Sequence, residues 1–248
     1  MKLRCALAGL LFTVSVADAA DVAVLSAGAV EPGLKPVLAA FERESGHRVT
    51  LSFATAPQIR ERVASGAAQP DLVIAPSAVL DELAAAAKVG TTARVSIGRV
   101  GIGVAVRPGS VRPDLTSADT LKRALLEADE VAYNRASTGL YVEGLIKRWN
   151  LTDTLQPKTV RFADGASVME HVIKGKGNEI GFGAITEIKA FGPKGLKLVG
   201  PLPADVQNYT SYDAVRMTLA PSADAANAVL KLLASSAGKA MFVSAGIE

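Results

Sequence analysis

The sequence predicts an α/β protein of two lobes, each a mainly parallel sheet flanked by helices, with a ligand cleft between the lobes. Two observations indicate this fold: short apolar runs alternate with amphipathic helical segments, and two such series are separated by Pro and Gly. Such alternation requires parallel strands, right-handed crossovers and helices on both faces of a sheet. Because ligands of open α/β folds bind where strand ends and helix N-termini converge, we expect the site between the lobes.

The first series follows a short N-terminal segment. We expect strands at 22–25, 49–53 and 72–75, and helices at 34–45, 57–65 and 77–87. The first of these helices carries Leu34, Val37 and Phe41 on one face, as a helix packed against a sheet does. Ser77 is a suitable N-cap for the third helix.

The second series follows an apolar, glycine-dotted run at 95–106, which is too long for one simple strand and ends before Pro108. We expect strands at 130–133, 159–162, 180–182 and 196–199, and helices at 121–128, 140–149 and 168–174. Beyond Pro203 we expect a strand at 210–219 and helices at 223–234 and 238–243. These boundaries assign 20–105 and 204–248 to lobe 1 and 106–203 to lobe 2.

The N-terminus has the pattern of a secretory signal. Lys2 and Arg4 precede an apolar stretch too short to span a bilayer, and Ala17-Asp18-Ala19 has the small-x-small form of a cleavage site. We interpret 1–19 as a cleaved signal peptide and expect the remainder in the periplasm. Cys5 lies before the apolar stretch, where it could not become the lipid-modified residue of a lipoprotein.

Composition narrows the classes of partner and cofactor. Of 27 Lys and Arg and 24 Asp and Glu, the first nineteen residues hold Lys2, Arg4 and Asp18, which leaves a net charge of about +2. This balance disfavours nucleic acid and anionic membranes as partners. With two histidines and no cysteine after Cys5, we expect no metal site and no cofactor. Nothing in the sequence indicates more than a monomer.

Hydroxyl residues follow four of the strand-like runs, at the points where helices begin. They are Ser26, Thr55, Ser137 with Thr138, and Ser167. Each junction offers free backbone N–H groups, a side-chain hydroxyl and the positive end of a helix dipole, which together hold a small anion without any cationic side chain. Helix capping explains any one of these residues equally well. Because two junctions fall in each series, the pattern predicts an anion held between the lobes.

One cationic residue lies near these junctions. Arg135 precedes Ser137 in the same loop, where its guanidinium could make a bidentate contact with a carboxylate. The alternative is a solvated loop arginine with no ligand. We carry Arg135 forward as a candidate ligand contact.

Several segments resemble one known family. The order of Leu-Ser-Ala-Gly-Ala at 25–29, Ser-Phe-Ala-Thr-Ala at 52–56, Pro-Asp-Leu-Val-Ile at 70–74 and Ser-Thr-Gly at 137–139 is similar to that of the periplasmic molybdate-binding proteins. The resemblance implies a type II periplasmic binding protein that delivers an oxyanion to an inner-membrane ABC permease. It also implies ligand contacts from the hydroxyls and amides at Ser26, Ala27 and Thr55, and from the second lobe.

One position departs from that family's pattern. In Ile-Gly-Phe-Gly-Ala-Ile-Thr-Glu at 180–187, Ala184 stands where these proteins usually place a tyrosine before a Thr-Asp pair. The missing phenol leaves room for a larger ligand, so a small carboxylate is the alternative to molybdate. The Tyr-x-x-x-Ser-x-Gly segment at 133–139 is similar to a branch that includes a periplasmic aconitate isomerase.

The sequence therefore leaves two functions open. The first is a solute-binding protein for a small anion, without enzymatic activity. The second is a cofactor-free isomerase of a tricarboxylate, acting by a 1,3 proton shift that needs a base near the bound anion. Glu31, in the first strand-to-helix loop, is the carboxylate that chain order places near the cleft, and it is the candidate base.

Overall fold

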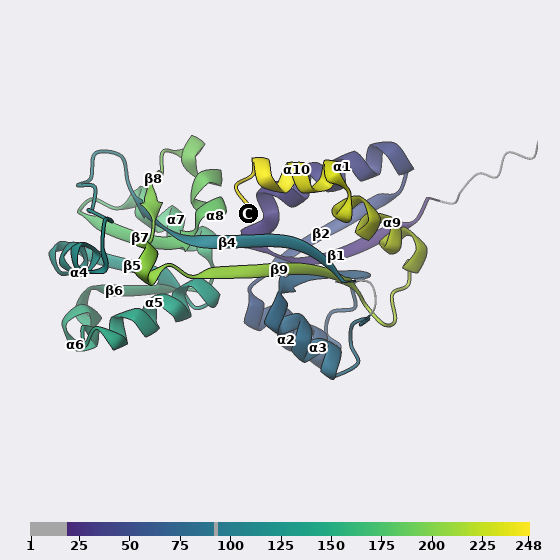
Figure 1. The fold of residues 1–248 in the computed structure, drawn as a ribbon, viewed down its shortest axis with the longest axis horizontal. Helices are drawn as coiled ribbons and strands as arrows, with labels where there is room; N and C mark the ends of the chain where they lie inside the picture. Colours follow the sequence, from purple (N-terminus) through teal and green to yellow (C-terminus); the bar gives the residue numbers. More distant parts are fainter. Residues whose placement is uncertain (1–18, 92–93) are drawn as a thin grey trace, which may run out of the picture.

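The computed structural model describes residues 19–91 and 94–248, and shows two lobes joined by two long strands (Figure 1). All but the last residue of the expected signal peptide therefore lies outside the described residues. The first lobe holds strands β1 (Asp21–Ala27), β2 (Arg48–Ala54) and β3 (Leu72–Pro76). Its helices are η1 (Gly28–Val30), α1 (Glu31–Ser45), α2 (Ala56–Ser65), α3 (Ser77–Ala85), α9 (Ala223–Ala234) and α10 (Ser236–Ser244).

The second lobe has the same alternation. Its strands are β5 (Glu130–Asn134), β6 (Thr159–Phe162), β7 (Glu179–Ala184) and β8 (Lys197–Pro201). Its helices are α4 (Ala118–Glu127), α5 (Ser137–Arg148), α6 (Thr152–Leu155), α7 (Gly165–Lys174) and α8 (Ile185–Ala190). Short 3₁₀ turns are η2 (Gln156–Lys158), η3 (Gly192–Lys194) and η4 (Ala204–Val206). The two strands that run through both lobes are β4 (Val95–Val106) and β9 (Tyr209–Arg216) (Figure 1).

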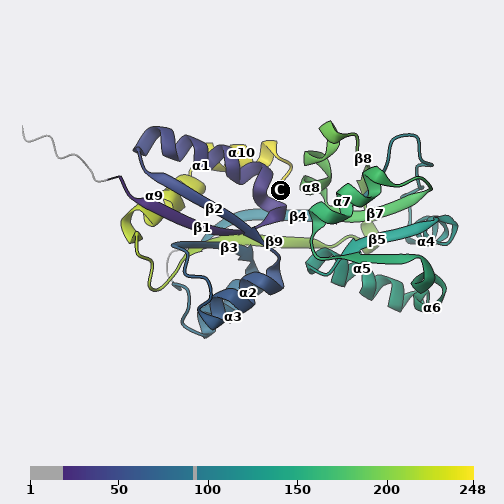
Figure 2. The same ribbon diagram turned by 180° about the vertical axis from the view of Figure 1, so that it is seen from behind.

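The expected α/β fold is confirmed, with helices on both faces of each half of the sheet. In the first lobe α1 and α10 cover one face and α2 and α3 the other, as the view from behind also shows (Figure 2). The strand order is β2-β1-β3-β9-β4-β7-β5-β6, with β8 also paired to β4. The pairs of β1 with β2 and β3, and of β5 with β6 and β7, are parallel. The long strands β4 and β9 pair antiparallel to each other and to their neighbours.

The run at 95–106 corrects the expectation from sequence, because it is one strand. Its first half pairs with β9 and its second half, from Ile102, pairs with β7. The register shifts between Ser96 and Gly98, and Gly98 has a φ of 132°. Such a backbone conformation favours glycine. The strand is long because it serves two lobes in turn.

The hydrophobic cores follow the same division. One cluster of buried side chains draws on 22–100 and 212–247 together with Ala184, and two further clusters draw on 102–202. The first lobe is therefore assembled from both ends of the chain. The lobe limits expected at 105/106 and 203/204 stay a prediction. Across the described ranges, no helix combines the length and apolar character needed to cross a membrane.

Candidate functional site

A cavity of about 230 Å³ lies between the lobes, at the ends of β1, β2, β5 and β7 where helices begin. Its volume is slightly below the ~300 Å³ at which pockets for drug-sized ligands begin, so it suits a small solute. No Lys, Arg or His is among the described residues that line it. An anion bound here would be held by neutral donors.

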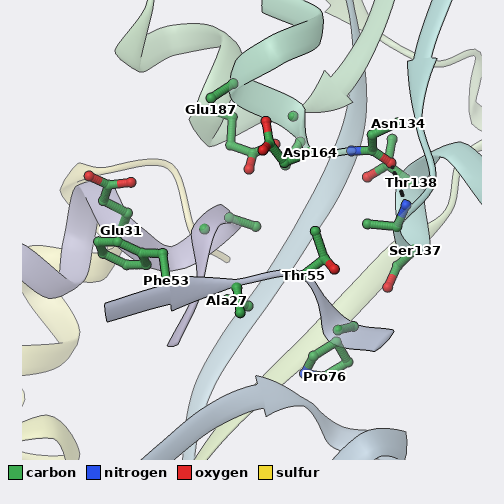
Figure 3. Close-up of a pocket in the computed structure, with 18 of the residues that line it drawn as sticks. Ala27, Glu31, Phe53, Thr55, Pro76, Asn134, Ser137, Thr138, Asp164 and Glu187 are labelled. Carbon is green, nitrogen blue, oxygen red and sulfur yellow. Dashed lines mark hydrogen bonds between the residues drawn. The ribbon is translucent and has the colours of Figure 1, made fainter. Parts of the chain in front are cut away.

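Figure 3 shows that the polar side chains form two groups. We call Thr55, Asn134, Ser137 and Thr138 the hydroxyl wall, and Glu31, Asp164 and Glu187 the carboxylate wall; all seven line the cavity. In the view of Figure 3 Glu31 and Glu187 lie to the left and above, whereas Thr55, Ser137 and Thr138 lie to the right. Glu31 and Glu187 therefore lie away from the three hydroxyls, and Asp164 lies between the two groups.

Two helices begin at the hydroxyl wall. Thr55 is the N-cap of α2, and its backbone N–H donates to Oε1 of Gln58 at 2.9 Å, one half of a capping box. Ser137 and Thr138 are the first two residues of α5. The first turns of both helices therefore direct N–H groups and positive dipole ends toward the cavity.

Asn134 fixes the turn that places Ser137 and Thr138. Its side chain is buried, and Oδ1 accepts from the N–H groups of Ala136 and Gly139 at 3.0 Å each. A methyl group on Gly139 would collide with the backbone carbonyl of Asn134. Only glycine permits this close approach, so the start of α5 depends on the pair Asn134 and Gly139.

The carboxylate wall is built from three different helix starts. Glu31 begins α1 and forms an ion pair with Lys35 one turn later. Asp164 is the N-cap of α7, where Oδ1 accepts from the N–H of Ser167 at 2.8 Å. Glu187 lies in the first turn of α8.

Glu187 lies where the two lobes meet. Its Oε1 lies 3.1 Å from the position of a methyl group on Gly28, and a methyl group on Gly165 would collide with its carboxylate. Gly28 belongs to the first lobe and Gly165 to the second. The neighbouring Thr186 hydroxyl donates to the carbonyl of Ala29 at 2.6 Å, which ties α8 to the first lobe. Two glycines thus leave the room that this side chain occupies.

Burial raises the pKa of Glu187 to about 7, and the negative charges of Asp164 and Glu31 act in the same direction. Hydrogen bonding at the backbone of Ala184 opposes the shift but is the smaller effect. A carboxyl with this pKa is present in both its protonated and ionised forms near neutral pH. The carboxylate wall can therefore release or accept a proton under ordinary conditions.

Tyr212, on β9, adds a phenol to the cavity lining. The residue is 6% exposed, and burial raises its pKa above the ordinary value of 10, with a further contribution from the charge of Glu187. The phenol therefore stays neutral across the physiological range and can donate a hydrogen bond. Ala184, where the resembling family has a tyrosine, also lines the cavity.

A metal centre finds no support in this geometry. Within the part of the chain that the structure describes, no three His, Cys, Asp or Glu side chains are grouped so that they could hold an ion. The carboxylate wall is accordingly interpreted through its protons and charges.

The structure brings together five of the eight residues singled out from the sequence. Ala27, Glu31, Thr55, Ser137 and Thr138 line the cavity. Their contact with a ligand stays a prediction.

The other three residues lie elsewhere. Ser26 is fully buried within β1, and its hydroxyl donates to the carbonyl of Ala27 at 3.1 Å. Arg135 is exposed and does not line the cavity. The N–H of Ser167 is already bonded to Asp164, so a carboxylate of the protein occupies the position expected for the ligand. In this structure the cavity is formed without these three side chains.

Sequence reasoning missed Asn134, Asp164, Glu187 and Tyr212. Asp164 had a signal, because an Asp three residues before Ser167 is a typical N-cap. Glu187 occupies the acid position of the Thr-Asp pattern, but with one more methylene. Tyr212 had no signal, since only the path of β9 through both lobes brings it to the cavity.

Comparison with known proteins agrees with this fold. The family model described as bacterial extracellular solute-binding protein matches residues 22–248. An aconitate isomerase from a Pseudomonas species is 31% identical over 221 residues, covering 86% of this chain and 81% of that protein. The molybdate-binding protein ModA of Escherichia coli strain K12 is 24% identical over 202 residues, covering 80% of this chain and 77% of its own.

A solved structure gives the same result for the fold. The periplasmic molybdate-binding protein of Azotobacter vinelandii superposes with a TM-score of 0.76 at 17% identity, covering 92% of this chain and 98% of that one. At this identity the likeness concerns the fold alone. The family match, by contrast, extends over both lobes and the cavity between them. The chain therefore belongs to the bacterial extracellular solute-binding proteins.

Proposed function

We propose that this protein binds a small organic acid in the interlobe cavity, with one carboxylate of the ligand at the hydroxyl wall. The observation that carries the proposal is that hydroxyl residues at the starts of α2 and α5 line the same cavity as three carboxylates, with Thr55, Ser137 and Thr138 on the side away from Glu31 (Figure 3). Hydroxyls and N–H groups of helix starts hold an anion without a cation. The carboxylate wall then faces the rest of the ligand.

The carboxylate wall favours an organic acid over molybdate. A fully ionised tetrahedral oxyanion carries only acceptor oxygens and concentrates its charge in a small volume, so every side of it that faced an ionised carboxylate of this wall would be repelled. An organic acid separates its anionic end from C–H, hydroxyl or protonated groups, which tolerate a neighbouring carboxylate. Ala184, in place of a tyrosine, leaves further room for such a ligand.

The location and the partner are part of the same proposal. The secretory pattern at 1–19 and the extracellular solute-binding family support a periplasmic protein. We propose that it delivers its ligand to an inner-membrane ABC permease and acts as a monomer. Proteins of two lobes joined by strands close about their ligands by hinge motion, and closure would present both lobes to the permease.

Calorimetric titration of the purified protein tests the ligand class. The probes are trans-aconitate, citrate and malate, with molybdate, tungstate and sulfate as fully ionised comparators. We expect binding of at least one carboxylate at micromolar concentration and none of the three oxyanions. Tighter binding of molybdate than of every carboxylate would contradict the proposed ligand class. Failure of all six anions to bind would contradict anion binding itself.

Glu187 favours a second candidate function, isomerisation of an unsaturated tricarboxylate. In a 1,3 proton shift, the ionised Glu187 would take a proton from the sp³ carbon next to the double bond, and the C–H electron pair would delocalise over the three carbons and a carboxylate; the double bond reaches its new position when the far carbon is protonated. The resulting dienolate charge would be stabilised by donors at the hydroxyl wall, and Glu187 would return the proton to the far carbon. A carboxyl with a pKa of about 7 can act in both steps at neutral pH. The similarity to aconitate isomerase is consistent with this chemistry.

Glu187 replaces Glu31 as the candidate base in this second function. The side chain of Glu31 is 37% exposed and paired with Lys35, whereas Glu187 is half-buried where the lobes meet and has a pKa raised to about 7. Ultraviolet absorbance of trans-aconitate incubated with the protein would report the cis isomer. Turnover that Glu187→Gln abolishes and Glu31→Gln leaves intact would support this assignment. Binding without any turnover would restrict the protein to solute binding.

A further inference from the structure

The resembling family usually has a tyrosine where this chain has Ala184. In this protein a tyrosine on another element, β9, supplies a phenol to the cavity. Tyr212 is contributed by β9, which runs through both lobes, and it lines the same cavity as Ala184. Thr210 lies two residues earlier on the same face of the strand. The protein thus places a neutral phenolic donor at the cavity from a different direction.

Glu187 lines the same cavity as this phenol, and its charge adds to the effect of burial in raising the pKa of Tyr212. The pKa of Glu187 is raised first by burial and then by the negative charges of Asp164 and Glu31, and none of the described lining residues is a cation. A protonated carboxyl at this point is a hydrogen-bond donor, as the phenol is.

Other charged groups on the elements around α8 are engaged elsewhere. Lys35 pairs with Glu31, Glu179 pairs with Arg107 at the opposite end of β7, and His171 pairs with Glu130 near the C-terminal end of α7. On α8 itself, Lys189 is exposed beside Gly246. These contacts leave Asp164, Glu31 and Tyr212 as the titratable neighbours that face Glu187.

We infer that protonated Glu187 and Tyr212, which line the same cavity, form a pair of donors that receives a second carboxylate of the ligand. This inference rests on the proposed function, and it narrows the ligand class to di- and tricarboxylates. The ligand's second negative charge, next to Asp164 and Glu31, is compatible with the cavity when Glu187 carries a proton. Binding is therefore coupled to the uptake of one proton.

The coupling has a defined sign. Below neutral pH Glu187 already holds its proton, so the dissociation constant is independent of pH. Above the pKa of about 7 each unit of pH costs a factor of about ten in the population of the competent form, and the dissociation constant rises by the same factor. Tyr212 stays neutral throughout and contributes equally at each pH.

Titration with trans-aconitate between pH 6 and pH 9 tests the pair. For the unmodified protein we expect the dissociation constant to rise about tenfold per pH unit above pH 7. Calorimetry at pH 8 in two buffers of different ionisation enthalpy is expected to show uptake of about one proton. Glu187→Gln, a neutral donor at every pH, is expected to retain the affinity of pH 6 within a few-fold and to lose the slope.

Tyr212→Phe is expected to weaken binding about tenfold at every pH and to keep the slope. Two matched controls lie outside the cavity: Tyr209→Phe on the same strand, where Tyr209 stacks with Arg99, and Glu170→Gln on the exposed side of α7. Both are expected to behave as the unmodified protein does. Circular dichroism of each variant verifies that it is folded.

The outcomes separate the inference from the proposed function. A slope that persists in Glu187→Gln, or a Tyr212→Phe protein that binds as Tyr209→Phe does, would overturn the donor pair while anion binding stands. Binding of trans-aconitate with no dependence on pH would do the same. If neither trans-aconitate, citrate nor malate binds at pH 6, the proposed function fails and the inference fails with it.

Discussion

The two walls of the cavity are positioned by similar means but have opposite chemistry. Both consist of residues at or next to helix starts, yet the hydroxyl wall offers neutral donors and the carboxylate wall offers three acids. The hydroxyl wall owes its shape to a tight turn at Asn134 and Gly139, whereas in the carboxylate wall burial and the charges of its two neighbours raise the pKa of Glu187. A helix N-terminus therefore does not by itself make an anion site. Whether an anion can bind depends on which group accepts hydrogen bonds from the N–H groups of the first turn, a ligand or a carboxylate of the protein.

The largest expected effect tests the dependence of the hydroxyl wall on backbone fit. Gly139→Ala would force a methyl group into the carbonyl of Asn134, so we expect a loss of about 3 kcal/mol in the free energy of unfolding. Gly144→Ala, on the same helix, meets its nearest atom on Arg148 at 3.5 Å and is expected to stabilise by about 0.5–1 kcal/mol. Urea unfolding measures both. Equal effects would show that the turn at Asn134 tolerates a side chain.

The next effect concerns the charge of the carboxylate wall. The pKa of Glu187 is raised from 4.5 to about 7, so between these values the folded state keeps a proton that the unfolded chain has lost. Stability therefore falls as pH rises through this window and stays lower above it. The free energy of unfolding of Glu187→Gln is expected to match that of the unmodified protein below about pH 4 and to exceed it at pH 8 by about 2 kcal/mol. This is less than the full value of the pKa shift, because solvent reaches the side chain through the cavity.

Urea unfolding at the two pH values measures this difference. Glu170→Gln, exposed on α7, serves as the control and is expected to show no gain at pH 8. If the stability of Glu187→Gln relative to the unmodified protein does not rise between pH 4 and pH 8, ionisation of Glu187 costs the folded protein little free energy.

A smaller effect compares a residue of the hydroxyl wall with its buried counterpart. Ser137→Ala is expected to weaken trans-aconitate binding by about 1.5 kcal/mol, the usual loss when a donor to a charged group is removed. The hydroxyl of Ser26 is bonded to Ala27 outside the cavity, so Ser26→Ala is expected to leave affinity unchanged. Calorimetric titration of the two variants with trans-aconitate shows which of the two hydroxyls contacts the ligand. Loss of affinity in Ser26→Ala alone would restore the interpretation drawn from the sequence.

The smallest effect comes from reducing the charge of the carboxylate wall while keeping its shape. Asp164→Asn retains an N-cap for α7, so stability is expected to change little. Removal of one negative charge near the ligand is expected to tighten trans-aconitate binding about threefold. Asp164→Ala lacks the cap and is expected to lose about 1 kcal/mol of stability as well. Weaker binding by Asp164→Asn would mean that the carboxylate accepts a proton from the ligand.

Most of the fold was predictable because its elements are locally encoded. The strand expected at 159–162 and the helix expected at 223–234 match β6 and α9 residue for residue, and other expected elements differ from the structure at their ends. The length of β4 was not predictable, because a strand shared by two lobes follows from tertiary pairing. The same holds for the antiparallel placement of β9, which a parallel series does not reveal.

The candidate site was predictable in part. Thr55, Ser137 and Thr138 follow from the rule that hydroxyl residues begin helices, and they line the cavity. The same rule selected Ser26, but β1 extends through it to Ala27 and buries its side chain. Chain order could not show that Glu187 reaches Gly28 across the seam of the lobes, because that contact joins residues far apart in sequence.

The shared strands also set an order for folding. The buried cluster of the first lobe needs both 22–100 and 212–247, whereas the clusters of the second lobe need only 102–202. A chain that emerges from its N-terminus can therefore complete the second lobe while the first still waits for β9 and the two final helices. Contacts of such sequence separation close slowly. Strand β3 therefore keeps one edge without its partner β9 until the C-terminal part of the chain is available, whereas β1 pairs with β2 and β3 from the same N-terminal segment.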